Sequence, residues 1–486
     1  MPKALRISIP SIPLGAIVPP LHPWAVQEAA ERIAEVLSAS KRGQVSNGGR
    51  PGRALVLTGA GISVDSGIAP YRGQGGHYEI HKSYRPIYYA EFSAQDDSGH
   101  RARQRYWNRS FLGFPPVRYA RPNPAHMAIA AMQRMGYVPD YITQNVDSLH
   151  HSATPSPSLA AQTILELHGT LQHVVCIASP PEYTASLSAS RPTPSPIDPA
   201  FQKLLLSYPL PPPLPTSSTF PTAQSLHNHN EDPNRSNASS NIPPAPVEYN
   251  TPSGKSAYPL GCGFRGSRAA FQDELARLNP KWEEYGRELM LGRAQAAAAS
   301  AHGEAGKDAR GEGEGRKRPK MNPDGDVDLG DGVDYTNFKY PSCPNCGGVL
   351  KPAVIFFGET VPTLLKDRAT SLVEQSSSML VVGSSLATYS AFRLIKQALD
   401  HPPSSSSSSL NSQQRELMVL NIGPTRADPL LSPKAKMELG SSEVLSLAAR
   451  LLAGGREKED PVLRRLLEGG EIVRRDGDAS SKVASS

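Results

Sequence analysis

The chain has 486 residues and a net charge of +6, which is modest for its length. No stretch approaches the roughly 18 consecutive apolar residues of a membrane-spanning helix, so we expect no membrane segment. The basic residues are spread along the chain, which argues against nucleic acid as a partner. The four cysteines are too few for a disulfide scaffold and instead indicate one metal site in a reducing compartment. They are Cys176, Cys262, Cys343 and Cys346.

Residues 1–44 are expected to form a leader followed by a helix. The first acidic residue is Glu28, as in a mitochondrial presequence, but prolines from Pro10 to Pro20 interrupt the amphipathic helix that such a presequence forms. A mitochondrial leader and a disordered cytosolic leader therefore both remain open. From Pro23, apolar residues at helical spacing predict a helix. These residues are Val26, Ala30, Ile33 and Leu37.

Short apolar runs alternate with helical patterns along the rest of the chain. The run 54–58 ends in a glycine turn and predicts a buried strand. Further strands are predicted at 141–143, 354–357, 379–382 and 417–422, and helices at 124–135, 364–376 and 390–399. This alternation predicts an α/β fold with a parallel sheet covered on both faces.

Three segments interrupt the pattern. Residues 179–258 are rich in Pro, Ser, Thr and Asn, residues 293–320 are rich in Ala, Gly and charge, and 402–414 contain six consecutive serines. Such compositions cannot bury enough apolar area to offset the entropy of ordering the backbone, so we predict disordered insertions. The basic run 316–320 resembles a nuclear-localisation patch, although a solvated loop is the more common explanation.

Two motifs at strand ends suggest a nucleotide site. Glycines directly after the first strand, Gly59 and Gly61, would let the backbone approach a pyrophosphate. The next glycine is Gly67, so the spacing differs from the usual dehydrogenase fingerprint, and a simple tight turn is the alternative. The segment 143–147 places two amides and a carboxylate at the edge where α/β sheets bind ligands, unless it only caps a helix. A single histidine, His168, follows; such residues are more often structural than catalytic.

Together these motifs resemble the sirtuin family in type and order, over roughly residues 45–450 without the insertions. The motifs are 59–63 with 66–68, 71–73, 143–147, 167–169, Cys343-x-x-Cys346, 357–359, 383–386 and 421–423. Details at 105–107, 122–126, 278–282, 323–326 and 420–426 resemble the class II branch, which includes mitochondrial members.

The resemblance implies a Rossmann-like parallel-sheet domain with a smaller zinc-ribbon and helical module. The Rossmann parts would span about 45–174 and 348–455, the zinc module about 175–347 with insertions at 179–258 and 293–320, and the tail 456–486. Sirtuins hold one structural zinc with two Cys-x-x-Cys pairs. Here the first pair is split by 85 residues between Cys176 and Cys262. Loop closure cost grows only logarithmically with length, so both can still reach one tetrahedral site. The alternative is that Cys262 is a bystander and that the metal site is lost.

The resemblance also implies a reaction in which NAD removes acyl groups from protein lysines and releases nicotinamide and O-acyl-ADP-ribose. Neutral His168 would be the base that activates a ribose hydroxyl, with Asn145 at the ribose. The implied cofactor residues are Gly59, Ala60, Gly61, Ser63, Tyr71, Arg72, Gln144, Asn145, Asp147, Gly383, Ser384, Ser385, Asn421, Ile422 and Gly423. The segment Phe357, Gly358 and Glu359 would bind the substrate peptide by strand addition.

Two positions depart from the family pattern. Ala69 and Pro70 stand where sirtuins usually have Pro-Asp, so we expect reduced activity, and Ser441 or Ser442 replaces a cysteine often found near the adenine. Two other functions remain open: mono-ADP-ribosyl transfer to protein at the same NAD site, and a non-catalytic, zinc-stabilised binding module. The branch resemblance favours the mitochondrial matrix, with cytoplasm or nucleus as alternatives.

Overall fold

A computed structural model of the chain describes residues 22–46, 53–71, 86–177, 264–301, 320–321, 327–328, 334–344, 347–400 and 415–473. Among the predicted site residues, Arg72, Cys262 and Cys346 lie outside these ranges. So do the predicted insertion 179–258 and most of the segments 293–320 and 402–414. Within the described residues, no helix is both long and apolar enough to cross a membrane.

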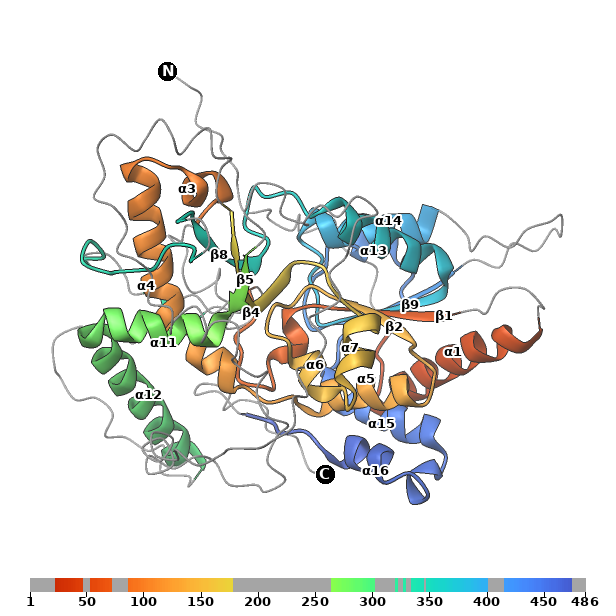
Figure 1. Ribbon diagram of the computed structural model, residues 1–486. Coiled ribbons are helices and arrows are strands. Elements are labelled where there is room, and N and C mark those ends of the chain that lie inside the picture. Colours follow the sequence, from red (N-terminus) through yellow and green to blue (C-terminus); the bar gives the residue numbers. More distant parts are fainter. Residues whose placement is uncertain are drawn as a thin grey trace.

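The predicted α/β fold is confirmed by a six-stranded parallel sheet (Figure 1). Its strands are β1 (Arg53–Thr58), β2 (Asp140–Thr143), β3 (Ile164–Glu166), β9 (Ser376–Val382), β10 (Glu416–Leu420) and β11 (Lys436–Met437). Their spatial order is β11-β10-β9-β1-β2-β3. The chain therefore winds outward from β1 in one direction and from β9 in the other. The carboxyl ends of β1 and β9 form the switch point where open α/β sheets bind ligands.

Helices cover both faces of this sheet, because its central strands are apolar on both sides. One face packs against α1 (Val26–Ser46), α5 (Pro124–Arg134), α6 (Leu149–Ala153), α7 (Pro157–Thr163), α15 (Ser441–Ala453) and α16 (Pro461–Glu468). The other packs against α13 (Thr363–Gln375) and α14 (Tyr389–Asp400). Val56 of β1 belongs to the first core, and its neighbours Leu55 and Leu57 belong to the second.

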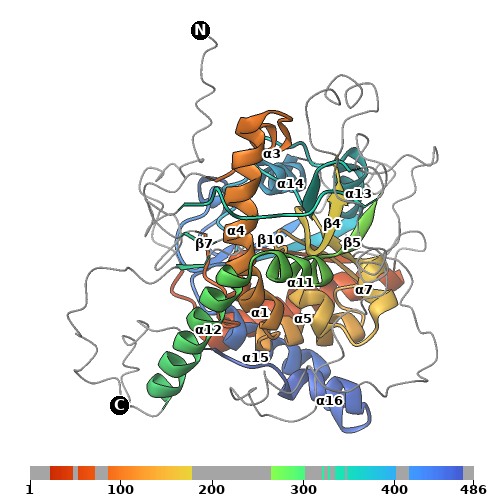
Figure 2. The same ribbon diagram turned by 60° about the vertical axis from the view of Figure 1, so that its left-hand side comes forward.

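A smaller module stands beside the main sheet. Its antiparallel strands, in the order β5-β4-β8, are β4 (Gly169–Cys176), β5 (Arg265–Ser267) and β8 (Leu350–Val354). The helices α3 (Tyr89–Ser93), α4 (Asp97–Tyr119), α11 (Arg268–Leu278) and α12 (Pro280–Ala301) gather on this side of the molecule (Figure 2). An aromatic core with Trp107, Phe271 and Phe338 joins them. A two-stranded ribbon, β6 (Lys320–Met321) and β7 (Val327–Asp328), completes the strands among the described residues.

Three expectations about individual segments need correction. The strand predicted at 354–357 lies earlier, because β8 pairs with β4 and ends at Val354. The helix α12 continues through Ala301, into the segment predicted to be disordered from 293. The segment after 455, predicted as a tail, folds onto the core as far as Val473: a short 3-10 turn, η4 (Arg456–Lys458), leads into α16, whose Leu463 and Leu466 are buried.

Candidate cofactor and catalytic site

The two glycine turns at the sheet switch point touch each other. β1 leads through Gly59 into the 3-10 turn η1 (Ala60–Ser63), and β9 ends at Val382, directly before Gly383. The Gly61 amide donates to the Gly383 carbonyl over 2.7 Å. Gly383 has φ +59°, and a Cβ there would lie 2.3 Å from the Ile62 backbone nitrogen. Only glycine fits this approach, which brings the two turns into contact at the carboxyl edge of the sheet.

Ser63, Asn145 and Asp147 form one buried polar cluster beside η1. The Ser63 hydroxyl donates to Asp147 Oδ2 over 2.7 Å and accepts from Asn145 Nδ2 over 3.0 Å. Asp147 Oδ1 accepts from the Leu149 amide over 3.0 Å. Burial raises the pKa of Asp147, while these two hydrogen bonds lower it. The cluster therefore presents an amide and a carboxyl group with fixed directions.

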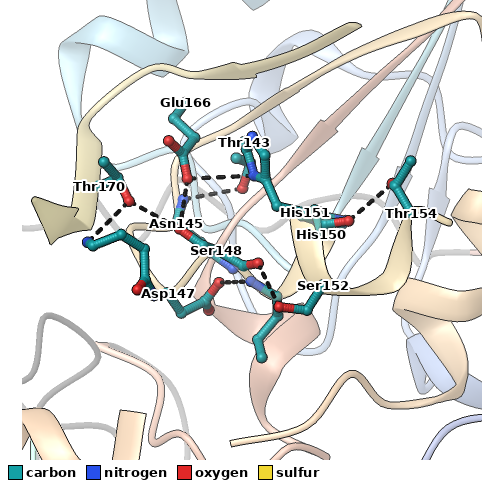
Figure 3. Close-up of polar contacts among 12 residues, drawn as sticks. Thr143, Asn145, Asp147, Ser148, His150, His151, Ser152, Thr154, Glu166 and Thr170 are labelled. Carbon is teal, nitrogen blue, oxygen red and sulfur yellow. Dashed lines mark hydrogen bonds and ion pairs between the residues drawn. The ribbon is translucent and has the colours of Figure 1, made fainter. Parts of the chain in front are cut away.

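The turn that follows Asp147 has a strained backbone and is held by side chains of neighbouring strands. Ser148 has φ +58°, a left-handed conformation that is costly for a residue with a Cβ. Its hydroxyl lies 2.9 Å from both Glu166 Oε1 and Thr170 Oγ1, which tie the turn to β3 and β4 (Figure 3). These contacts connect the second strand end to the segment around His168.

Gln144 joins the two halves of the sheet. Its backbone amide donates to the Thr58 carbonyl over 2.9 Å, and its side-chain Nε2 donates to the Ser384 hydroxyl over 2.7 Å. The Thr388 hydroxyl donates to Gln144 Oε1 over 3.3 Å. Ser384 also accepts from the Leu386 amide, and the adjacent Ser385 carbonyl accepts from the Arg426 amide. The segments at 144 and 384 are therefore one connected unit.

His168 lies on the turn between β3 and β4 with both ring nitrogens engaged. Nδ1 is 3.1 Å from the Gln144 carbonyl, which can only accept, so Nδ1 carries the proton. Nε2 is then the proton acceptor, and it lies 2.7 Å from the Ser390 hydroxyl. Burial lowers the pKa of His168 to about 4. The imidazole is therefore neutral near pH 7 and chemically able to act as a base.

Two buried histidines behind the site were not singled out from the sequence. The rings of His126 and His150 lie 4.7 Å apart. His126 lies 3.0 Å from Asn123 and 3.5 Å from the Ser63 hydroxyl, and His150 lies 2.9 Å from the Thr58 hydroxyl. Burial lowers the pKa of both, that of His126 to about 3. They support the cluster as neutral rings; the available signals were the 122–126 motif and the position of His150 after Asp147.

The segment after β10 reaches the same edge of the sheet. Asn421 Nδ2 donates to the carbonyls of Ile422 and Gly423, and Gly423 has φ +85°. The Ile422 side chain is 72% exposed. Beyond it, η3 (Asp428–Leu430) is fixed by the buried ion pair of Asp428 with Lys436, 2.7 Å apart. This turn therefore presents backbone and an apolar side chain outward at the end of the sheet.

Residues near the end of the described chain hold the loop Asp65–Gly67, called the glycine loop below, through hydrogen bonds. The Val473 amide donates to the Asp65 carbonyl over 2.8 Å, and Val473 forms a parallel bridge with Ser66. A Cβ on Gly67 would lie 3.2 Å from the Val473 side chain. The Ser442 hydroxyl donates to Asp65 Oδ2 over 2.5 Å. The loop with Ala69, Pro70 and Tyr71 therefore follows a segment that Val473 and Ser442 hold in place.

Phe357, the last residue of the strand predicted at 354–357, lies instead in a turn with Gly358 and Glu359. Phe357 makes an isolated bridge with Tyr88, and its carbonyl accepts from the Tyr89 amide over 2.9 Å. Glu359 Oε2 accepts from the Phe356 amide over 2.8 Å and pairs with the buried Lys351 at 3.0 Å. Burial lowers the pKa of Lys351, and the Glu359 charge opposes that effect. The carboxylate of Glu359 therefore holds the turn together.

The predicted zinc ligands are described only in part. Cys176 and Cys343 are both buried in the aromatic module. Cys176 ends β4 opposite Leu350, and the turn 343–348 closes through hydrogen bonds between Cys343 and the Gly347 and Gly348 backbone. No group of three or more metal-binding side chains occurs within the described ranges, which omit two of the four cysteines.

The doubly wound sheet and its paired glycine turns define a protein of the nucleotide-binding α/β class. A model of the Sir2 family matches residues 59–200 and 326–390. NAD-dependent protein deacylase SIR4 of Batrachochytrium dendrobatidis is 32% identical over 394 residues, 81% of this chain and 88% of that protein. NAD-dependent protein deacylase SRT2 of Arabidopsis thaliana is 31% identical over 80% of this chain and 70% of its own length. The chain therefore belongs to the Sir2 family.

More distant similarities were also found. NAD-dependent protein lipoamidase sirtuin-4, mitochondrial, of Bos taurus is 28% identical over 88% of both chains. A solved Sir2 homologue in complex with ADP-ribose is 18% identical over 88% of this chain and 98% of that one, with a TM-score of 0.44. The family assignment rests on the sequence relatives.

Proposed function

We propose that this Sir2-family protein is an NAD-dependent protein-lysine deacylase that uses His168 as its base. The observation that carries the proposal is the position of neutral Nε2 on the same connected unit as Gln144, Asn145 and Ser63. Curated relatives named NAD-dependent protein deacylase, deacetylase and lipoamidase support this class of activity.

NAD as substrate supplies a weak glycosidic bond to nicotinamide, which makes the ribose carbon reactive toward the acyl oxygen. The chain then has to hold the ribose, direct the carboxamide of nicotinamide and accept a hydroxyl proton. Asn145 and Gln144 offer amide groups at the ribose position, and Asp147 offers a carboxyl group to the carboxamide. The turns at Gly59, Ala60, Gly61, Gly383, Ser384 and Ser385 would lie along the phosphates, with Asn421, Ile422 and Gly423 at the adenosine end. Tyr71 and Arg72 would also contact the cofactor. Nε2 of His168 takes the proton.

The test is nicotinamide release by the purified full chain incubated with NAD and a panel of acetyl-, lipoyl- and longer-acyl-lysine peptides. We expect release that depends on one class of peptide, formation of O-acyl-ADP-ribose, and loss of the product in His168→Ala. His151→Ala, at a partly exposed residue of α6, is the matched control. Release that is unchanged in His168→Ala would contradict the proposal.

Mono-ADP-ribosyl transfer to protein is the second candidate function, because it uses the same departure of nicotinamide. Labelled NAD separates the two. Label recovered as free acyl-ADP-ribose indicates deacylation, whereas label that stays on protein through denaturation indicates transfer. A chain that binds NAD and neither releases nor transfers label is the non-catalytic binding module.

We also propose one structural zinc held by Cys176, Cys262, Cys343 and Cys346. The burial of the two described cysteines beside β4 and β8 fits this site, since buried thiolates need a cation. Four thiolates leave no open position, so the zinc would stabilise the small module. Metal analysis should find one zinc per chain, and Cys343→Ser should lose it and lower the melting temperature. A full zinc content in that variant would exclude Cys343 as a ligand.

The domain limits and location follow as further proposals. The Sir2 domain begins near residue 45 and extends to Val473, and the segment 179–258 is an insertion between the proposed zinc ligands Cys176 and Cys262. The substrate peptide binds along Phe357, Gly358 and Glu359. The chain works in mitochondria, a location supported by its similarity to the bovine sirtuin-4, which is named as mitochondrial. Fluorescent fusion of the intact N-terminus tests this, with cytoplasm and nucleus as the other outcomes.

A further inference from the structure

The proton-accepting nitrogen of His168 is occupied by another side chain of the protein. Ser390 Oγ lies 2.7 Å from Nε2, while the opposite ring nitrogen contacts the Gln144 carbonyl. Ser390 lies in the first turn of α14 and is half-buried, and it is far from His168 in sequence. Because Nδ1 carries the ring proton, the hydroxyl of Ser390 must donate to Nε2.

His168, with Nε2 already hydrogen-bonded to Ser390, can accept a proton from a substrate hydroxyl in two ways. Either the substrate hydroxyl displaces Ser390, or the proton passes through the Ser390 hydroxyl. Displacement by backbone movement is costly, because α14 is anchored by Ala391, Leu394 and Ile395, which are fully buried. The preceding loop is tied to Gln144 through Ser384 and Thr388. The backbone of Ser390 therefore stays beside His168, and its half-buried hydroxyl can face both the ring and a bound substrate.

We propose that Ser390 relays the proton from the substrate hydroxyl to His168, an inference that rests on the proposed function. The substrate O–H bond breaks as a new Ser390 Oγ–H bond forms, and the original Oγ–H bond breaks as Nε2–H forms. The electron pair left on the substrate oxygen makes the new bond to carbon. Ser390 is regenerated unchanged, and His168 holds the proton until turnover is complete.

The first test needs no substrate. Imidazole nitrogens of the NAD-free protein are observed by NMR after labelling with ¹⁵N-histidine, and the His168 signals are identified by their loss in His168→Ala. We expect a protonated Nδ1 and an Nε2 shift that moves in Ser390→Ala and returns toward the wild-type value in Ser390→Thr. A signal that is identical in all three proteins overturns the hydrogen bond and with it the relay.

The second test measures the relay itself. Ser390→Ala should lower the rate of acyl-ADP-ribose formation by about 100-fold, the lower range for loss of acid–base assistance, while Ser390→Thr stays within about threefold. In mixtures of light and heavy water, the wild-type rate should curve with deuterium fraction because two protons move, and the Ser390→Ala rate should be linear. Ser390→Ala that is equal to or faster than wild type, or a linear wild-type plot, overturns the relay. A wild-type protein that releases no nicotinamide overturns the proposed function as well.

Discussion

Replacing Gly383 by alanine tests whether the contact between the two glycine turns builds the cofactor site. The residue has φ +59°, and an added Cβ would lie 2.3 Å from the Ile62 nitrogen and 2.6 Å from the Gly61 carbonyl carbon. Both neighbours are backbone atoms in the turn after β1, so neither can rotate away. The turns therefore have to separate before an alanine fits.

The structure supplies a control for the magnitude. Gly454, at the end of α15, has φ +55° with nothing within 4 Å of its added Cβ. Gly454→Ala should cost only the left-handed strain, about 1–2 kcal/mol. Gly383→Ala should add an overpacking cost of about 1–3 kcal/mol. At ~3 °C per kcal/mol for a domain of this size, the melting temperature should fall by about 6–15 °C, against about 3–6 °C for the control.

Thermal unfolding of both variants and the KM for NAD are the measurements. We expect the KM to rise at least about tenfold in Gly383→Ala, because displacement of positioned groups by about 1 Å is enough for such losses. In Gly454→Ala the KM should be unchanged. Equal melting temperatures for the two variants, together with an unchanged KM in Gly383→Ala, would refute the view that this close approach shapes the site.

Three further predictions concern the charge and support of the site. Because burial lowers the pKa of His168 to about 4, the acid limb of kcat/KM should lie nearer to 4 than to the ordinary 6.5; a limb at 6.5 contradicts that burial. Between these two pKa values the unfolded chain binds more protons than the folded chain. The free energy of unfolding should therefore fall as the pH drops from about 6.5 to about 4, as urea unfolding can check. Glu359→Gln leaves Lys351 buried without its partner charge and should cost about 3–5 kcal/mol in urea unfolding, whereas a loss under 1 kcal/mol would show a pair open to water. Val473→Pro removes the amide that donates to Asp65 and should raise the KM for NAD several-fold, with Ile472→Ala as the exposed neighbouring control; equal KM values would separate this segment from the site.

Short-range sequence patterns correctly predicted those strands and helices whose position is determined within a short stretch of chain. The strand before Gly59 and the helices at 124–135 and 364–376 agree with β1, α5 and α13 within a residue or so, because burial on both faces and helical periodicity are visible in a short window. The strand predicted at 354–357 was misplaced because its position depends on pairing with a strand that is distant in sequence. Its apolar residues are buried by packing, with Phe356 in the aromatic core, and the end of β8 depends on where β4 stops.

The residues of the site also divide into those that the sequence indicated and those that it did not. The family resemblance placed Ser63, Asn145 and Asp147 among the cofactor residues, and in the structure their side chains form one hydrogen-bonded cluster. The Ser390 contact could not be predicted, since it joins positions 222 residues apart and depends on how α14 packs. The segment after 455 was missed although its signals were present: Asp460 as a helix cap, Pro461 in the first turn and leucines at helical spacing.

The bridge from Val473 to Ser66 has a consequence for how the protein is made. The loop at Ser66 leaves the ribosome about 400 residues before Val473, the residue that bridges to it. A nascent or prematurely terminated chain could pair β1 with β2 and still hold an unsupported loop. NAD would then bind only chains that include Val473, and NAD added during refolding should protect chains that contain this residue from proteolysis far better than chains that stop at residue 469.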